Sequence, residues 1–254
     1  MTGICIAGIT GWTGSAIAEG VAAAGDLELR SGVSRSGAGG TVAGAPVLAR
    51  VTEALDGVDV LIDFTSHHVA REHALTAIAA GVAVVIGTSG LVADDFAAID
   101  AAARAAGVGV VASGNFSLTA AMMAAGALLA ARHLPHWEII DYAGAAKPDV
   151  PSGTARELAE RLGASRIGRP LDEIAGPVEA RGASVAGTQV HSVRLPSFVV
   201  STEVVFGLPD ERLSIRHDAG GSPVPYVAGA LLAARAAGER AGLTRGLDTL
   251  LAGG

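Results

Sequence analysis

The first half of the chain alternates short apolar runs with segments of helical periodicity. The runs expected to form strands cover residues 4–7, 27–33, 58–64, 82–86 and 108–112. This alternation is typical of an α/β fold built around a parallel sheet. The run at residues 82–86 is almost purely β-branched, which predicts a strand buried on both faces. We therefore expect an open, mostly parallel sheet with helices between its strands.

From Trp137 onward the pattern changes, because strand signals follow one another with few helices between them. A long helix is expected before this point, at residues 118–133, and a shorter one begins near Thr154. The remaining strands are expected at residues 137–142, 188–195, 198–206 and 212–216, the last three as successive antiparallel strands. Residues 224–241 return to a helix, and the short tail is expected to fold back on the first domain. The pattern predicts a second α+β domain with a mixed, largely antiparallel sheet.

The first strand leads into three glycines, Gly8, Gly11 and Gly14, and then into a helix. Their G-x-x-G-x-x-G spacing is looser than the G-x-G-x-x-G fingerprint, because Thr10 occupies the middle position. The physical demands are similar: a tight turn, room for a pyrophosphate and close packing of the helix on its strand. The motif therefore predicts a dinucleotide site, although many glycine-rich turns between strand and helix serve no ligand.

The second strand ends in Ser34, Arg35 and Ser36, at about the distance where such folds meet the adenosine ribose. An acidic residue there would favour NAD. Arg35 between two serines instead offers a cation and hydroxyl donors suited to a 2′-phosphate, so we expect NADPH as the cofactor, with NADH possible. The alternative is a solvated arginine in a turn.

The later strands of the first domain also end in small polar or glycine-rich clusters, at residues 63–65, 87–90 and 113–116. Ligands of open α/β sheets lie at the carboxyl ends of the strands, so these clusters are expected to line one groove. His67, His68 and His73 follow the third strand and resemble a metal set by composition only. They lack a carboxylate partner at helical spacing, and no metal site is expected.

Residues 141–155, DYAGAAKPDVPSGTA, place Lys147 five positions before Ser152, Gly153 and Thr154, where a helix begins. Free backbone N–H groups and the positive end of the helix dipole converge at such a start. The stretch thus predicts a site for a carboxylate or phosphate. The alternative is a surface loop with an ordinary solvated lysine.

The composition of the chain is typical of a globular protein that does not bind nucleic acid. The 254 residues are 50% hydrophobic, enough for a substantial core, and the formal net charge of −7 argues against nucleic-acid binding. The single cysteine, Cys5, lies in the first apolar run and is expected to be a buried small hydrophobe in a reducing, cytoplasmic setting. No signal-peptide pattern precedes the first strand, and glycine and polar residues interrupt the longest uncharged stretch. We expect no membrane partner.

The order of motifs GITGWTG, DFT, GTSG, NFS, K-x-D-x-P-S-G-T-A, V-H-S-V-R and FG-x-x-x-E-x-L-x-I-x-H resembles that of the 4-hydroxy-tetrahydrodipicolinate (dihydrodipicolinate) reductase family. The resemblance spans almost the whole chain. Its most specific part is residues 147–155, where the family pattern is K-x-D-A-P-S-G-T-A and Val150 is the only departure. The resemblance implies a Rossmann-like NAD(P)-binding domain at residues 1–117 and 226–254. It also implies a substrate-binding and oligomerisation domain at residues 118–225, which would build a homotetramer.

The resemblance also implies the site residues and the reaction. A hydride would pass from C4 of the nicotinamide to a conjugated cyclic imine with two carboxylates, while an acid supplies a proton. Lys147 would be the catalytic residue. Substrate binding would fall to Lys147, Ser152, Gly153 and Thr154. Cofactor-binding residues would be Gly8, Gly11, Trp12, Thr13, Gly14, Arg35, Gly87, Thr88, Ser89, Ser113, Asn115 and Phe116.

The chain departs from the family where the acid is expected. Members carry a His-His pair four and three residues before the lysine, and here those positions are Ala143 and Gly144. A histidine often found just before the lysine is replaced by Ala146, and Trp12 stands where the family has Arg or Lys. A general acid contributes about 10²- to 10⁴-fold in rate. Either Lys147 or a water supplies the proton, or the substrate differs from the family's.

Three functions therefore stay open at this point. The first is a dihydrodipicolinate-type reductase of lysine and diaminopimelate synthesis. The second is the same hydride chemistry on another cyclic imine or imino acid, in a widened, non-basic pocket left by residues 143–146. The third is a non-catalytic NADP-binding regulator. His191 and His217 are candidates for a displaced acid, and His191 is expected instead to be an in-sheet histidine satisfied by backbone.

Overall fold

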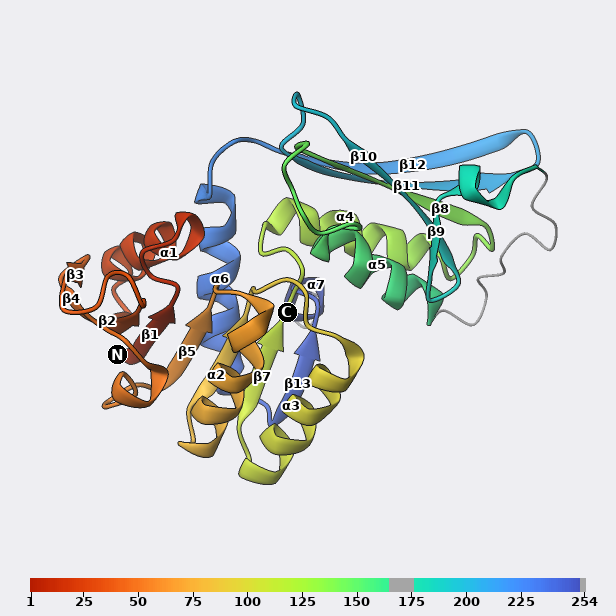
Figure 1. Ribbon diagram of the computed structural model, residues 1–254. Coiled ribbons are helices and arrows are strands. Elements are labelled where there is room, and N and C mark those ends of the chain that lie inside the picture. Colours follow the sequence, from red (N-terminus) through yellow and green to blue (C-terminus); the bar gives the residue numbers. More distant parts are fainter. Residues whose placement is uncertain (165–175, 252–254) are drawn as a thin grey trace. The chain divides into compact units, whose positions relative to one another are not determined.

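The computed structural model describes residues 1–164 and 176–251. The chain divides into two compact units (Figure 1). Unit 1 comprises Met1–Leu118 and Pro223–Gly254, and unit 2 comprises Thr119–Ser222. No helix in the described ranges combines the length and the apolar character that crossing a membrane requires.

Unit 1 is built on an eight-stranded sheet whose order is β13-β7-β6-β5-β1-β2-β4-β3. All neighbouring strands are parallel except β3 and β4. The strands are β1 (Thr2–Ala7), β2 (Leu27–Val33), β3 (Thr41–Val42), β4 (Ala45–Leu48), β5 (Val60–Asp63), β6 (Ala83–Ile86), β7 (Gly109–Ala112) and β13 (Gly242–Arg245). The helices are α1 (Trp12–Ala23), α2 (His67–Ala79), α3 (Ala93–Ala106), α6 (Val224–Ala237) and α7 (Asp248–Leu251), with a 3₁₀ turn η1 (Val51–Glu53).

Helices cover both faces of this sheet. Helix α1 packs against α6, and α2 packs against α3 (Figure 1). From β1 the chain passes to β2 on one side and returns to β5 on the other. The carboxyl ends of β1 and β5 therefore form the switch point at which ligands of such sheets bind.

The predicted α/β sheet is confirmed, and all four residues of β6 are buried. Cys5 is buried as expected, and this burial raises the pKa of its thiol to about 11. The helix predicted at residues 224–241 ends early, at Ala237, and Gly242 begins the short strand β13 parallel to β7. The tail thus folds back onto unit 1, but as a strand. Four residues with only one large apolar side chain carry too little periodicity to predict it.

Unit 2 is built on a five-stranded sheet of order β12-β11-β8-β10-β9. Its strands are β8 (Trp137–Ala143), β9 (Ala183–Val185), β10 (Thr188–Arg194), β11 (Val200–Leu208) and β12 (Glu211–Ala219). Its helices are α4 (Leu118–Ala130) and α5 (Gly153–Gly163), with a 3₁₀ turn η2 (Val178–Arg181). The sheet is mixed, since β8 and β10 run parallel while the other pairs are antiparallel. The three runs predicted as successive antiparallel strands do run antiparallel, and β11 pairs with β12, but β10 and β11 are not neighbours because β8 lies between them.

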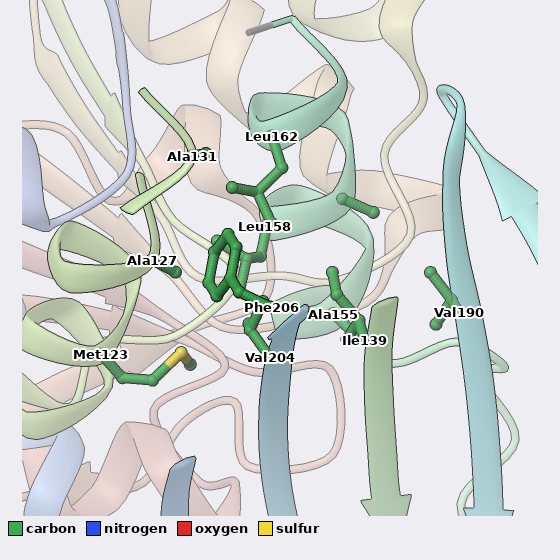
Figure 2. Close-up of a cluster of buried hydrophobic side chains, with 11 residues drawn as sticks. Met123, Ala127, Ala131, Ile139, Ala155, Leu158, Leu162, Val190, Val204 and Phe206 are labelled. Atoms are coloured by element: carbon green, nitrogen blue, oxygen red, sulfur yellow. The ribbon is translucent and has the colours of Figure 1, made fainter. Parts of the chain in front are cut away.

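The core of unit 2 lies between one face of this sheet and helices α4 and α5 (Figure 2). Phe206 and Val204 of β11 pack with Ile139 of β8 against Leu158 of α5. Along β8 every second residue is buried, so Asp141 and Ala143 lie on the same face as Ile139. The packing that buries the apolar residues therefore also buries one carboxylate.

Glycine allows α6 to approach the strand-end loop of β7. A Cβ added at Gly229 would lie 2.0 Å from the backbone oxygen of Phe116 and 2.7 Å from Cδ2 of Leu247. Since real atoms cannot approach so closely, any side chain at this position would push α6 away from the loop that ends in Phe116.

We predict that Gly229→Ala lowers the free energy of unfolding by about 1–3 kcal/mol, because it overpacks this contact. Gly238→Ala at the end of the same helix is the matched control, since no atom lies within 4 Å of its ideal Cβ. Denaturant unfolding of both variants measures the difference. Equal stability of the two variants would contradict the close approach.

Candidate functional site

The loop after β1 has a geometry that only glycine allows. Gly8 has a φ of 85°, and a Cβ at this position would lie 2.4 Å from the backbone oxygen of Phe64. A Cβ at Gly14 would lie 2.1 Å from the oxygen of Gly8. The N–H of Gly11 donates to that oxygen over 2.9 Å, and Gly11 caps α1 without a side-chain hydrogen bond. The turn therefore suits an anion bound by backbone N–H groups at the start of α1.

The loop after β2 is tied to this glycine turn. The hydroxyls of Thr10 and Ser34 are 2.7 Å apart, and the N–H of Gly8 donates to the oxygen of Val33 over 2.9 Å. Arg35 follows Ser34 and is exposed. Arg35, the cation of the Ser34–Ser36 cluster, thus lies near the glycine turn. A contact with the adenosine end of a dinucleotide would require this placement.

Trp12 is the first residue of α1 and is 55% exposed. Its ring packs edge to face on that of Tyr226 in α6, with centroids 6.1 Å apart. Burial raises the pKa of the Tyr226 hydroxyl. At this position the chain presents an aromatic pair and no cation.

The loops after β5, β6 and β7 meet around Phe64. A Cβ at Gly87 would lie 2.2 Å from Cζ of Phe64, so the ring lies directly on the Gly87 backbone. The rings of Phe64 and Phe116 pack edge to face at 5.4 Å. Thr88 is buried and Ser89 exposed, while the Ser113 hydroxyl donates to the oxygen of Asn115 over 2.9 Å. The structure thus joins the clusters that were expected at one edge of the sheet.

The histidines of α2 contact different groups. No group of three or more His, Cys, Asp or Glu side chains with ligand geometry occurs within residues 1–164 and 176–251. His67 and His68 stack on each other with ring centroids 3.9 Å apart. His73 instead points to Asp63, with 2.7 Å between Nδ1 and Oδ2. Sequence spacing within the helix could not reveal this partner, because Asp63 ends the preceding strand.

Asp141 is the buried anchor of unit 2. It has no exposed surface, and its carboxylate accepts from the N–H of Ser152 over 2.8 Å and from the Ser152 hydroxyl over 2.7 Å. The same hydroxyl accepts from the N–H of Ala155 over 3.3 Å, which makes Ser152 the N-cap of α5. The side chain of Ser152 is therefore engaged inside the protein, and it fixes where α5 begins.

Arg194 completes this anchor, and sequence reasoning missed it although it ends the V-H-S-V-R motif. One of its terminal nitrogens, Nη2, donates to Oδ2 of Asp141 over 2.8 Å and to the backbone oxygen of Asp149 over 2.9 Å. Ser192 adds a hydrogen bond to Asp141 over 3.2 Å. The guanidinium thus links the carboxylate to the loop that carries Lys147.

Lys147 lies in that loop with its side chain 30% exposed. Its Nζ is 2.8 Å from Oδ1 of Asp149, and its N–H donates to the oxygen of Gly144 over 3.0 Å. Gly153 and Thr154, the first residues of α5, are partly exposed, and no acidic residue lies in the first turn. An ammonium group and a helix start with no acidic residue in its first turn are the components of a carboxylate site.

The positions of the missing histidine pair are tightly packed. Ala143 has no exposed surface, and a Cβ at Gly144 would lie 3.2 Å from the backbone oxygen of Phe198. The space at Ala143 is therefore filled, whereas Gly144 is partly exposed and Ala145 and Ala146 are exposed. Of the candidate acids, His191 is 2.7 Å from Oε2 of Glu138, so its partner is a carboxylate and not backbone as expected. His217 is buried, and this burial lowers the pKa of its imidazole.

Comparison with known proteins covers both units. The family described as "Dihydrodipicolinate reductase, N-terminus" matches residues 2–116, and its C-terminal counterpart matches residues 115–251. A protein of Moorella thermoacetica named 4-hydroxy-tetrahydrodipicolinate reductase is 36% identical over 98% of this chain and 97% of that protein. The protein of that name from Cutibacterium acnes is 34% identical over 99% of both chains.

Solved structures agree with this grouping. A dipicolinate-bound dihydrodipicolinate reductase from Paenisporosarcina sp. TG-14 superposes with a TM-score of 0.78 at 27% identity, covering 98% of this chain and 99% of that one. GenD2 from gentamicin A biosynthesis, in complex with NAD, has a TM-score of 0.67 at 17% identity, covering 99% and 90% of the two chains. The second likeness concerns the fold alone.

The anchoring role of Ser152 gives a prediction for stability. Ser152→Ala removes the N-cap and one donor to a fully buried carboxylate, so we expect the free energy of unfolding to fall by about 2–3 kcal/mol. Ser184→Ala on the exposed edge strand β9 is the matched control and should change it by less than about 0.5 kcal/mol. Denaturant unfolding measures both. A Ser152→Ala variant as stable as the control would refute the anchor.

Proposed function

Because the chain belongs to the dihydrodipicolinate reductase family, we propose that it reduces 4-hydroxy-tetrahydrodipicolinate in lysine and diaminopimelate biosynthesis. It is a pyridine-nucleotide-dependent oxidoreductase. The observation that carries the proposal is the loop from Lys147 to the start of α5, which is held on Asp141 by Ser152 and Arg194.

This loop would bind a carboxylate of the substrate. The ammonium group of Lys147 and the backbone N–H groups of Gly153 and Thr154 supply the positive charge and the donors. Ser152, whose hydroxyl is already shared between Asp141 and Ala155, contributes by fixing the helix start. A small dicarboxylate with an imine is the substrate class that such a site fits.

The glycine turn of unit 1 fits a dinucleotide. A side chain at Gly8 or Gly14 would clash with backbone, and such a tight turn of glycines lets the backbone approach a pyrophosphate closely. The cofactor, when bound, supplies a hydride from C4 of its nicotinamide. Backbone groups of Gly8, Gly11, Thr13 and Gly14, next to Trp12, would hold the pyrophosphate. The nicotinamide side would be lined by Gly87, Thr88, Ser89, Ser113, Asn115 and Phe116. NADPH is the proposed cofactor, with NADH also accepted, and Arg35 would contact the 2′-phosphate.

Lys147 is also the proposed proton donor. It is the sole lysine among the 18 lysine and arginine residues of the chain. An arginine would bind a carboxylate at least as well through its two parallel N–H groups, but it cannot release a proton. A lysine at this one position therefore suits a task that needs a titratable amine, and Asp149 at 2.8 Å holds that amine in place.

We also propose that the protein works in the cytoplasm as a homotetramer, without nucleic-acid or membrane partners. The family resemblance and the second sheet support the assembly. On the face away from α4 and α5, Tyr142 packs on Phe198, and Arg216 lies 4.8 Å above the Tyr142 ring. Such aromatic and arginine side chains are enriched in interfaces.

Lys147 variants test the proposed mechanism. With enzymatically generated dihydrodipicolinate precursor, NADPH oxidation should fall about 10²- to 10⁴-fold in Lys147→Ala, because both the cation and the acid are lost. Lys147→Arg keeps the cation, so it should retain a KM for the substrate near wild type while kcat falls as in Lys147→Ala.

The control measurement is NADPH binding, which both variants should retain. A small panel of other cyclic imines is assayed in parallel. Turnover of the precursor that is unaffected by Lys147→Ala would overturn the mechanism. Turnover of another imine in preference to the precursor would overturn the proposed substrate.

Arg35 tests the cofactor preference. Arg35→Ala should raise the KM for NADPH about tenfold or more and leave that for NADH nearly unchanged, because a charged hydrogen bond to the 2′-phosphate is lost. Arg235→Ala, which removes an arginine paired with Asp26 at the opposite end of β2, is the matched control. Equal effects of Arg35→Ala on the two cofactors would refute the assignment.

A further inference from the structure

Asp63 is the last residue of β5, and its carboxylate is completely buried. Oxygen Oδ1 accepts from the N–H of Thr65 over 3.0 Å, from the Thr65 hydroxyl over 2.7 Å and from the Thr88 hydroxyl over 2.5 Å. Oxygen Oδ2 accepts from Nδ1 of His73 over 2.7 Å. Donors from three segments of unit 1 thus converge on one carboxylate, as a charge removed from water requires.

These hydrogen bonds fix the two loops that follow β5 and β6. The Thr88 hydroxyl donates to Asp63 and also accepts from the N–H of Thr65 over 2.8 Å. The N–H of Gly87 donates to the backbone oxygen of Asp63 over 2.9 Å. These hydrogen bonds tie residues 87 and 88 to residues 63 and 65, so a movement of the Asp63 carboxylate would move them as well.

The same carboxylate also restrains the glycine turn of β1. Phe64 lies between Asp63 and Thr65, and its oxygen stands 2.4 Å from where a Cβ of Gly8 would be. Its ring rests on Gly87. A shift of the segment after β5 would therefore push against the loops of β1 and β6 together.

His73 is joined to this arrangement through Asp63. It lies on α2 with its side chain 18% exposed, and its ring nitrogen must be the donor because a carboxylate only accepts. Without it, Oδ2 would remain buried with no other donor among the hydrogen bonds described for Asp63. Relief would come from movement of Asp63 toward water, and the two loops would move with it.

We propose that Asp63 and His73 are positioning residues of the cofactor site, which set the place of Gly87 and Thr88 without touching the cofactor. The inference rests on the proposed function, which assigns Gly87 and Thr88 to the nicotinamide side. It adds two residues to the machinery and gives a role to a histidine that resembled a metal ligand by composition.

The test compares NADPH affinity in two His73 variants, measured by the fluorescence of the bound cofactor. His73→Leu removes the donor and should raise the Kd about tenfold, whereas His73→Asn can donate from its amide and should stay within about threefold of wild type. Glu72→Leu, at an exposed position of the same helix, is the matched control and should leave the Kd unchanged. A His73→Leu variant that is folded and binds NADPH like wild type would overturn the proposal.

A second pair of variants guards against a merely structural effect. Thr88→Val removes the hydroxyl at nearly constant shape and should weaken NADPH binding, while Thr88→Ser should restore it. If both residues act through Asp63, the double variant His73→Leu/Thr88→Val should raise the Kd less than the product of the two single changes. Independent, multiplicative effects would overturn the shared role of Asp63.

Kinetics separate this inference from the proposed function. His73→Leu should raise the KM for NADPH and leave the KM for the imine substrate unchanged, while His73→Asn should stay near wild type in both. Wild type that binds NADPH but reduces no precursor would overturn the proposed substrate, while the Kd series would still decide the role of Asp63 and His73. Wild type that binds neither NADPH nor NADH would overturn both.

Discussion

A carboxylate that has left water must find its donors inside the protein, and this constraint organises both units. Asp63 and Asp141 have no exposed surface, and each stands near the carboxyl end of a strand. Each gathers its donors from a loop that belongs to the candidate site: Thr88 in unit 1 and Ser152 in unit 2. An unpaired buried charge would cost several kcal/mol, so the hydrogen bonds to Asp63 and Asp141 hold these two loops in place.

The strands of unit 1 and their glycine-rich ends could be predicted because the signals are local. A β-branched run of about four or five residues is typical of a strand buried in a parallel sheet. Gly8 and Gly14 lie within one stretch of seven residues and form a turn in which a side chain at either position would clash with backbone. The order of strands in unit 2 could not be predicted in this way. Strand β8 separates β10 from β11, and this depends on pairing between residues about 50 positions apart.

Side-chain partners show the same division. The position of Ser152 directly before Gly153 is enough to predict that a helix starts there. Arg194 and Asp141, by contrast, are 53 positions apart in the sequence, and so are His191 and Glu138. Both pairs exist because β8 and β10 lie side by side in parallel register. His73 and Asp63 are only 10 positions apart, but one lies in a helix and the other ends the strand before it. Neither the helical nor the strand repeat therefore predicts their contact. Local motifs are enough to nominate candidate residues, but the groups that hold those residues in place could not be predicted.

The absence of the histidine pair is also a matter of packing. Ala143 lies in the sheet opposite Arg194 on one side and Val200 on the other, with no exposed surface. A histidine at this position would need room now occupied, and one at Gly144 would press on the oxygen of Phe198. A histidine at residue 143 would therefore require β8 and its neighbours to move, while Lys147 stands in a loop with nearly a third of its side chain exposed. Because this loop lies outside the strands, the ammonium group of Lys147 is accessible without any change in the sheet.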